Sequence, residues 1–139
     1  MVTFNQEGVI IKMVYGIGVD IIEVERIREG IQKHGERFQQ RIFTLDEIDY
    51  CLERNRPEIN FAARFAAKEA VVKALGTGLR DMRLTDIEIK NDQLGKPMIT
   101  LHNQAAEIAK DLGIKEVLIS LSHTEEYAVA QAVALSKKD

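Results

Sequence analysis

The feature that most constrains the fold is one stretch of good helix formers that ends in glycine, residues 60–78 (NFAARFAAKEAVVKALGTG). Alanine, leucine, glutamate, lysine and arginine dominate it, so it predicts one long helix. Asn60 is predicted to cap its start, because an asparagine oxygen can accept a free N–H of the first turn. Gly76 follows the last periodic residue and is predicted to end the helix. Alanines at every fourth position form a stripe of small side chains, which lets another backbone approach closely.

Two charges in this helix lie four residues apart, and they are neighbours on one face. Glu69 and Lys73 would contribute about 0.2–0.5 kcal/mol as an ion pair on a solvated face. Apolar and alanine stripes flank them, which instead favours partial burial, where charges need partners such as a metal or a phosphate. The helix alone leaves both interpretations open.

The composition is that of one ordinary globular domain: 139 residues, 45% hydrophobic, 29% charged. A net charge of −3 gives no indication of a nucleic-acid partner. No apolar run approaches the ~20 residues that span a membrane, and the N-terminus lacks a signal pattern, so no membrane association is expected. Cys51 is the only cysteine, which excludes an intramolecular disulfide and favours a reducing compartment. We therefore expect a cytoplasmic protein.

The patterned sequence begins after residues 1–12, which we interpret as an N-terminal extension of a domain spanning residues 13–139. Residues 14–22 (VYGIGVDII) predict a buried strand, with glycines that permit close approach. Asp20 interrupts this apolar run. It is either the N-cap of a helix predicted over residues 21–31 or a ligand for a cation, and both roles place it where the backbone turns.

Positive residues outnumber negative ones in the predicted helix and the loop after it, although the protein is acidic overall. They are Arg26, Arg28, Lys33, Arg37 and Arg41. With glutamates interleaved, such a mixture is typical of a solvated surface. The local excess of positive charge is also suited to docking an acidic partner.

Capping and alternation patterns place the remaining elements. Thr44 and Glu47 form a T-x-x-E capping box at the start of a helix over residues 44–54. Asn103 is predicted to cap a later helix that ends at Gly113. Alternating or apolar runs predict four further strands, over residues 85–90, 97–101, 116–122 and 127–135.

His123 lies in the tight connection between the last two predicted strands. It is either polar surface or, with Ser120 and Ser122 beside it, a contact for phosphate. No motif marks any of these serines as an activated nucleophile, so a Ser-His-Asp triad is not supported.

Four segments in chain order resemble the holo-[acyl-carrier-protein] synthases, the small phosphopantetheinyl transferases. The segments are GIGVDII with Arg26, RFAAKEAVVKALGTG, LGKP and ISLSHTEEYAVA. The resemblance extends from about Tyr15 to about Val133 and leaves residues 1–12 outside it. It implies an α+β domain with an antiparallel sheet packed against a long central helix, assembled as a homotrimer with active sites between subunits.

The resemblance also implies a reaction. The 4′-phosphopantetheine group of coenzyme A moves to a serine hydroxyl of apo-acyl carrier protein, a step of fatty acid biosynthesis that releases adenosine 3′,5′-bisphosphate. Asp20 and Glu69 match the positions of the Mg²⁺ ligands, and carboxylate and phosphate oxygens are what this ion prefers. Lys73 matches the motif lysine, which we assign to the phosphates of coenzyme A and the charge of the leaving group. Asp20, Glu69 and Lys73 are thus the predicted catalytic residues. The acceptor proton leaves through metal-bound water or through Glu69, and the sequence does not choose between them.

Binding residues follow from the same resemblance. His123 is expected to contact the phosphates of coenzyme A, with Ser122 as a weaker candidate. Gly76 and Gly78 would let the backbone approach the ligand.

Docking residues are implied as well, because acyl carrier proteins are strongly acidic. Arg26 matches a basic docking position of the family, and Arg28 is the next candidate, ahead of the other basic residues named above. The closing strand over residues 127–135 either belongs to the core or faces neighbouring subunits.

Two other functions compete with this one. A Mg²⁺-dependent phosphohydrolase could use the same carboxylate pair, but no Walker-type glycine run or larger acidic cluster accompanies it. A non-catalytic module that binds carrier protein would not need the motif residues Asp20, Glu69, Lys73 and His123, which are all present. The sequence favours the transferase over both.

Overall fold

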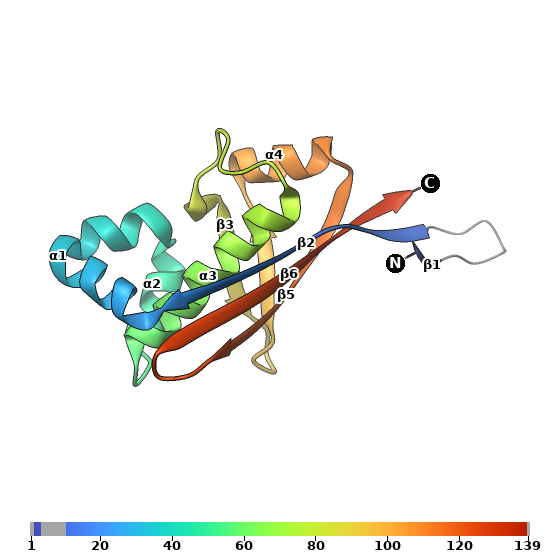
Figure 1. The fold of residues 1–139 in the computed structure, drawn as a ribbon. Helices are drawn as coiled ribbons and strands as arrows, with labels where there is room; N and C mark the ends of the chain where they lie inside the picture. The colour runs from blue at the N-terminus through green and yellow to red at the C-terminus, as the bar shows by residue number, and fades with distance from the viewer. Residues whose placement is uncertain (1, 4–10, 139) are drawn as a thin grey trace.

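The computed structural model describes residues 2–3 and 11–138 of the chain (Figure 1). The elements in order are β1 (Val2–Thr3), β2 (Ile11–Glu23), α1 (Val24–Ile42), α2 (Leu45–Leu52), α3 (Pro57–Leu75), the 3₁₀ turn η1 (Leu84–Asp86), β3 (Ile87–Asn91), β4 (Pro97–Leu101), α4 (Asn103–Asp111), β5 (Ile114–His123) and β6 (Tyr127–Lys138).

The strands form two antiparallel sheets, and the predicted α+β class is confirmed. The larger sheet has the order β1-β2-β6-β5, and β3 pairs only with β4. Helix α3 lies along one face of the larger sheet, with α1 and α2 near one end and α4 near the other (Figure 1). Most of the extension predicted over residues 1–12 lies outside the described residues, and its described parts belong to β1 and the start of β2.

The central helix is confirmed, but its predicted start was wrong. Helix α3 begins at Pro57, three residues before Asn60, because proline at the first helical position needs no N–H partner. Arg56 occupies the N-cap position, and the Asn60 side chain donates to the Arg56 carbonyl at 3.0 Å. Gly76 ends the helix in the left-handed conformation (φ 77°), as predicted.

The first helix was also predicted too early. Residues Ile21 and Ile22 pair with Val129 and Ala128 of β6, so the ladder of the sheet overrides their helical spacing. Strand β2 therefore runs to Glu23, and α1 starts at Val24. Asp20 lies within the strand and not at a helix N-cap, which excludes the capping role. Helix α1 is broken at Gly35 (φ 53°) before it ends at Ile42.

Two further capping patterns gave one correct and one incorrect prediction. The box at α2 is confirmed: Thr44 Oγ1 accepts from the Glu47 N–H at 3.2 Å, and Glu47 Oε1 accepts from the Thr44 N–H at 2.8 Å. At α4, however, His102 is the N-cap. Asn103 is the first helical residue (φ 49°), and its side chain instead donates to Asp86 Oδ1 at 3.3 Å.

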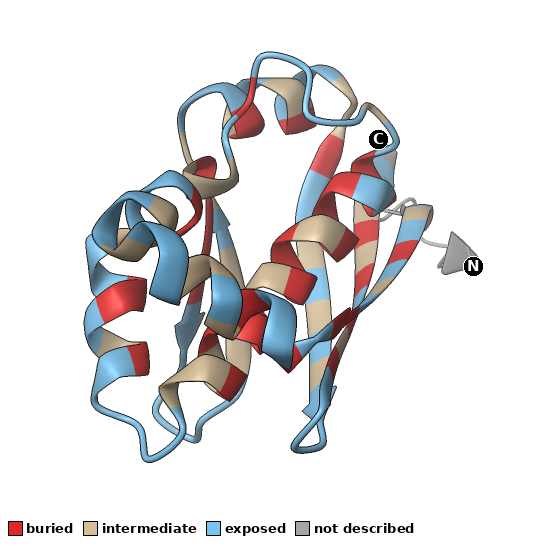
Figure 2. Cartoon of the chain, turned by 60° about the vertical axis from the view of Figure 1, so that its left-hand side comes forward, coloured by how far each residue is buried: buried red, intermediate tan, exposed pale blue. Residues whose placement is uncertain are grey.

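The larger sheet has two different faces (Figure 2). Along β6, the alanines alternate inward and are fully buried beneath α3: Ala128, Ala130, Ala132 and Ala134. The opposite face is open and mostly apolar, with Gln131 of β6 and Ser120 and Ser122 of β5 as polar members. Ile17, Val19 and Ile21 of β2 are 65%, 59% and 65% exposed on it, and Val129 and Val133 of β6 lie in register with this row.

The predicted closing strand therefore has a core face, as the first alternative predicts, and an open face on its other side. Among the described residues, no helix is long and apolar enough to cross a lipid bilayer.

Candidate functional site

Two glycines of β2 bring this strand into direct contact with α3. A Cβ at Gly18 would lie 2.0 Å from the Ala70 carbonyl oxygen, and one at Gly16 would lie 2.2 Å from that of Ala74. No side chain fits between these backbones. The alanine stripe of α3 and the G-x-G of β2 thus meet, as the small residues predict, and this contact positions Asp20, two residues beyond Gly18.

The three predicted catalytic side chains meet at this contact. Lys73 Nζ donates to Asp20 Oδ1 at 3.2 Å and to the Val19 carbonyl at 2.9 Å. Burial, and then the charge of Asp20, raises the pKa of Glu69, while Lys73 opposes the shift. Asp20 and Glu69 are half-buried, and Lys73 is exposed. Residues from a strand and from a helix far apart in sequence therefore form one charged group, so Glu69 and Lys73 are not an ordinary solvated pair.

The donor set of this group suits a hard cation. Two carboxylates share one lysine, which leaves excess negative charge in a partly desolvated place. Among the described residues, no group of three or more acidic, histidine or cysteine side chains could enclose a metal. Asp20 and Glu69 alone match Mg²⁺, which usually takes one or two carboxylates and fills its other positions with phosphate oxygens and water.

His123 lies in a separate cavity of about 450 Å³. Arg64 of α3, Tyr50 of α2 and Lys96 from the β3–β4 turn also line it. Tyr50 stacks under the Arg64 guanidinium, whose centre is 4.1 Å from the ring centroid. Arg64 Nη2 donates to Asn91 Oδ1 at 3.3 Å. The cavity therefore presents three groups that can contact an anion: an imidazole, a guanidinium and an ammonium.

Arg64 is the residue that sequence reasoning missed. It is 4% exposed, and its Nε is the one buried side-chain polar atom that lacks a hydrogen-bond partner within the described ranges. A buried donor without a partner is costly, which favours a ligand oxygen at this place. Its position inside the RFAAKEA segment was the only available signal, since Tyr50 and Asn91 meet it through tertiary contacts.

The two groups of residues lie on different flanks of α3. Asp20 is in register with Ala130 of β6 and, beyond it, with Leu121 of β5, so His123 is two strands away on the same face of the sheet. The separation of β2 and β5 across two strand spacings is about 9.6 Å, and His123 lies two residues beyond Leu121 along β5. Glu69 and Lys73 face β2, whereas Arg64 faces the cavity of His123. Within the described part of one chain, no hydrogen bond or ion pair connects His123 with the carboxylate pair.

The remaining predicted binding residues are Ser122, Gly76 and Gly78. Ser122 pairs with Val129 on the open face of the sheet, opposite to the face of His123. Gly76 and Gly78 have φ values of 77° and 67°, and a Cβ added at either residue would meet nothing within 4 Å. Their backbone conformation alone accounts for glycine at both positions.

The basic residues of α1 differ in their freedom to bind a partner. Arg26 is exposed. Arg28 contacts Glu25, and its Nη2 lies 3.5 Å from Glu58 Oε1. Arg37 and Arg41, further along the helix, line a groove of about 740 Å³ together with Arg83.

Comparisons with known proteins agree with this geometry. The sequence model of the 4′-phosphopantetheinyl transferase superfamily matches residues 16–132. The holo-[acyl-carrier-protein] synthase of Alkaliphilus metalliredigens is 52% identical over 122 residues, which cover 88% of this chain and 99% of that protein.

Solved structures show the same fold. The holo-[acyl-carrier-protein] synthase of Neisseria meningitidis is 38% identical with a TM-score of 0.82, over 88% of this chain and 98% of that one. The synthase of Bacillus anthracis in complex with CoA (3′,5′-ADP) is also 38% identical, with a TM-score of 0.73, over 89% and 98% of the two chains.

Proposed function

Because this chain belongs to the 4′-phosphopantetheinyl transferase superfamily, we propose that it transfers the 4′-phosphopantetheine group of coenzyme A to a serine hydroxyl of an apo-acyl carrier protein. The serine oxygen forms a bond to the β-phosphorus, and the bond from that phosphorus to the bridging oxygen breaks. The products are holo-acyl carrier protein, adenosine 3′,5′-bisphosphate and the proton of the hydroxyl. This modification serves fatty acid biosynthesis.

The observation that carries the proposal is the meeting of Asp20, Glu69 and Lys73 where β2 touches α3. The attacked phosphorus is surrounded by negative oxygens, and the leaving bisphosphate gains charge, so the reaction needs positive charge at fixed positions. Asp20 and Glu69 would hold Mg²⁺, which when bound supplies positive charge to the pyrophosphate. Lys73, anchored by Asp20 and the Val19 carbonyl, is available to the leaving phosphate.

Glu69 is one of the two routes by which the serine proton can leave, the other being water at the metal site. Its raised pKa belongs to the metal-free protein, because a bound Mg²⁺ would favour the charged carboxylate. No protein nucleophile is required, because the attacking hydroxyl belongs to the carrier.

We assign the cavity of His123 and Arg64 to the phosphates of coenzyme A. Arg64 Nε supports this assignment, because it is buried without a partner and can donate to a phosphate oxygen. The relative from Bacillus anthracis was solved with CoA (3′,5′-ADP), which supports the same class of ligand here. Ser122 stays a weaker candidate, since it lies on the other face of the sheet.

We assign the basic face of α1 to the acidic carrier protein. Exposed Arg26 lies at the start of this helix, close to the end of β2 that carries Asp20. The groove lined by Arg37, Arg41 and Arg83 extends the positive charge along it. Arg28 is a less suitable contact, because it is engaged with Glu25 and Glu58.

The active unit is proposed to be a homotrimer. The open apolar face of the sheet supports it, since monomeric proteins rarely expose contiguous apolar patches of this kind. An assembly would also allow the carboxylate pair of one copy to meet the His123 cavity of another. We place the protein in the cytoplasm, because a single cysteine favours a reducing compartment. That cysteine, Cys51, is buried, and burial raises the pKa of its thiol to about 12.

Intact-mass measurement tests the reaction. Apo-acyl carrier protein is incubated with this protein and coenzyme A, with Mg²⁺ in one sample and EDTA in the other. We expect the mass of a phosphopantetheine group to be added only with Mg²⁺. Hydrolysis of coenzyme A without carrier protein would instead indicate the phosphohydrolase, and carrier binding without turnover would indicate the binding module.

A further inference from the structure

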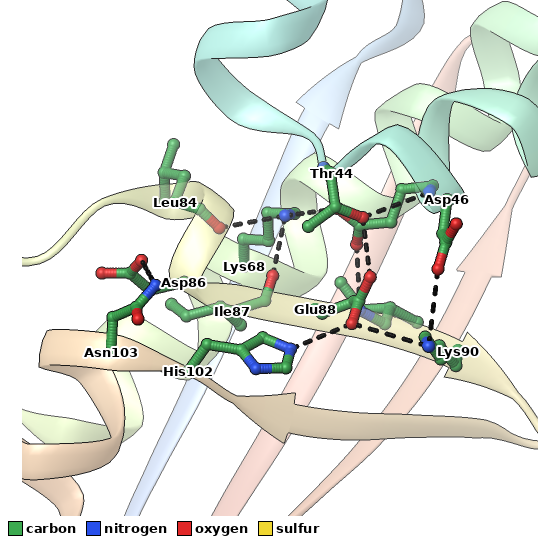
Figure 3. A network of polar contacts seen from close by, with 12 residues as sticks. Thr44, Asp46, Lys68, Leu84, Asp86, Ile87, Glu88, Lys90, His102 and Asn103 are labelled. Atoms are coloured by element: carbon green, nitrogen blue, oxygen red, sulfur yellow. Dashed lines mark hydrogen bonds and ion pairs between the residues drawn. The ribbon is translucent and has the colours of Figure 1, made fainter.

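Lys68, the residue before Glu69, is completely buried and makes three hydrogen bonds (Figure 3). Its Nζ lies 2.7 Å from Glu47 Oε1, 3.0 Å from the Leu84 carbonyl and 2.7 Å from the Ile87 carbonyl. An ammonium group has three hydrogens to donate, so these three acceptors use all of them. Lys68 is therefore not available to a ligand, and its contacts hold α3 to its neighbours.

Glu47 completes the network and accepts three hydrogen bonds. Besides Lys68, its carboxylate accepts from the Thr44 N–H at 2.8 Å and from the Ile89 N–H at 2.9 Å. Helix α3 is thus connected to the start of α2 and to the first residues of β3. Hydrogen bonds with well-defined directions fix both the position and the rotation of the helix at residue 68.

The face of α3 that packs on the larger sheet cannot fix its rotation as firmly, and the larger buried side chains of the helix, such as Phe61, Val71 and Leu75, make apolar contacts without a fixed direction. The side chains that pack it against the larger sheet are mostly alanines, and the facing strand offers glycines and alanines. Methyl groups allow close approach, but they leave few knobs that would resist a small turn about the helix axis. The buried ion pair is the strongest directional contact on this helix.

Resting on the proposed function, we propose that Lys68 is a positioning residue, whose bond to Glu47 sets the rotation of α3 that places Glu69 opposite Asp20. Lys68 and Glu69 are adjacent, so a change of rotation at one is passed to the other. A side-chain end lies about 5–6 Å from the helix axis, so a turn of about 10° moves it by about 1 Å. Errors of that size are enough to weaken a metal site.

The test replaces the charged pair in two steps. Lys68→Met removes the ammonium and leaves Glu47 buried without its cation, which destabilises the fold. The double variant Glu47→Gln with Lys68→Met removes both charges, and its glutamine can still accept from the backbone of Thr44 or Ile89. We expect the double variant to regain stability in thermal unfolding.

Metal binding then separates positioning from stability. Mn²⁺ binding is measured by electron paramagnetic resonance with coenzyme A present, which needs no turnover. We expect both variants to bind Mn²⁺ about 10–100-fold more weakly, as for other residues that orient metal ligands. In carrier-modification assays, kcat should fall while KM for carrier protein changes less than about twofold, because the proposed docking residues lie on α1.

Lys90→Met is the matched control, since it removes a lysine of β3 whose surface ion pair with Asp46, at 3.5 Å, reaches α2 but does not involve α3. It should bind Mn²⁺ as the wild type does. A stable double variant with wild-type Mn²⁺ affinity would overturn the positioning role. If the wild type bound Mn²⁺ but modified no carrier protein, the proposed function would fail, and the comparison of Mn²⁺ affinities would still decide the role of Lys68.

Discussion

The contact between Gly18 and α3 predicts a large effect from a single added carbon atom. In Gly18→Ala, the new Cβ would lie 2.0 Å from the Ala70 carbonyl oxygen and 2.8 Å from the Ala74 nitrogen. Both are backbone atoms, so no side chain can rotate away. Strand and helix must separate from 2.0 Å towards the 3.4 Å at which ordinary contact begins, a shift of about 1.4 Å.

This shift has consequences for stability and for activity. Overpacking of this kind costs about 1–3 kcal/mol of the free energy of unfolding. Asp20 follows Gly18 by two residues, so it moves away from Glu69 and Lys73. A misplacement of about 1 Å can cost about 10²-fold in rate, so we expect kcat to fall by that order. Initial rates from intact mass and urea unfolding measure the two effects.

Gly113→Ala is the matched control for this variant. Gly113 has φ 76° with nothing within 4 Å of an added Cβ, and it lies between α4 and β5, away from the candidate site. Left-handed strain costs about 1–2 kcal/mol, so the two variants should be comparably destabilised. Only Gly18→Ala should lose activity. If it kept the kcat and stability of the wild type, the packing of β2 on α3 described above would be wrong.

Three further predictions concern charge. Burial and the nearby Asp20 raise the folded-state pKa of Glu69, so the folded protein loses stability as the pH rises through that pKa. Metal-free Glu69→Gln should therefore melt above the wild type at neutral pH, with the difference vanishing below the ordinary pKa of 4.5, as scanning calorimetry would show. Arg26→Glu should raise KM for carrier protein and leave KM for coenzyme A nearly unchanged in steady-state assays, and an equal rise in both would refute the docking role. Ile17→Glu with Val19→Glu places charge on the open face of the sheet and should give monomers in analytical ultracentrifugation; trimers would show that another surface is used.

Much of the fold could be predicted because local patterns agree with it. The alanine-rich helix, the capping box of Thr44 and the alternating strands are present where expected. The errors lie at element ends. Ile21 and Ile22 have helical spacing, but pairing with β6 keeps them in a strand. The central helix starts at Pro57, where proline suits the first helical position, and not at the predicted cap Asn60.

The candidate site was predictable only where the residues belong to short segments. The motifs predicted Asp20, Glu69 and Lys73, which the structure brings together. Arg64 was missed because its partners Tyr50 and Asn91 come from other elements. Nothing in the pattern of charges along the sequence distinguishes buried Lys68 from exposed Lys73. The burial of Lys68 depends on Glu47 and on the backbone carbonyls that accept its other hydrogen bonds.

The division of the candidate site by α3 has a genetic consequence. A chain with Glu69→Gln keeps its His123 cavity, and a chain with His123→Ala keeps its carboxylate pair. If neighbouring copies complete each other's sites, mixing these two inactive proteins after dissociation would produce some assemblies in which an intact pair faces an intact cavity. Two defective alleles would then complement each other inside one oligomer, whereas two substitutions on the same flank of α3 would not.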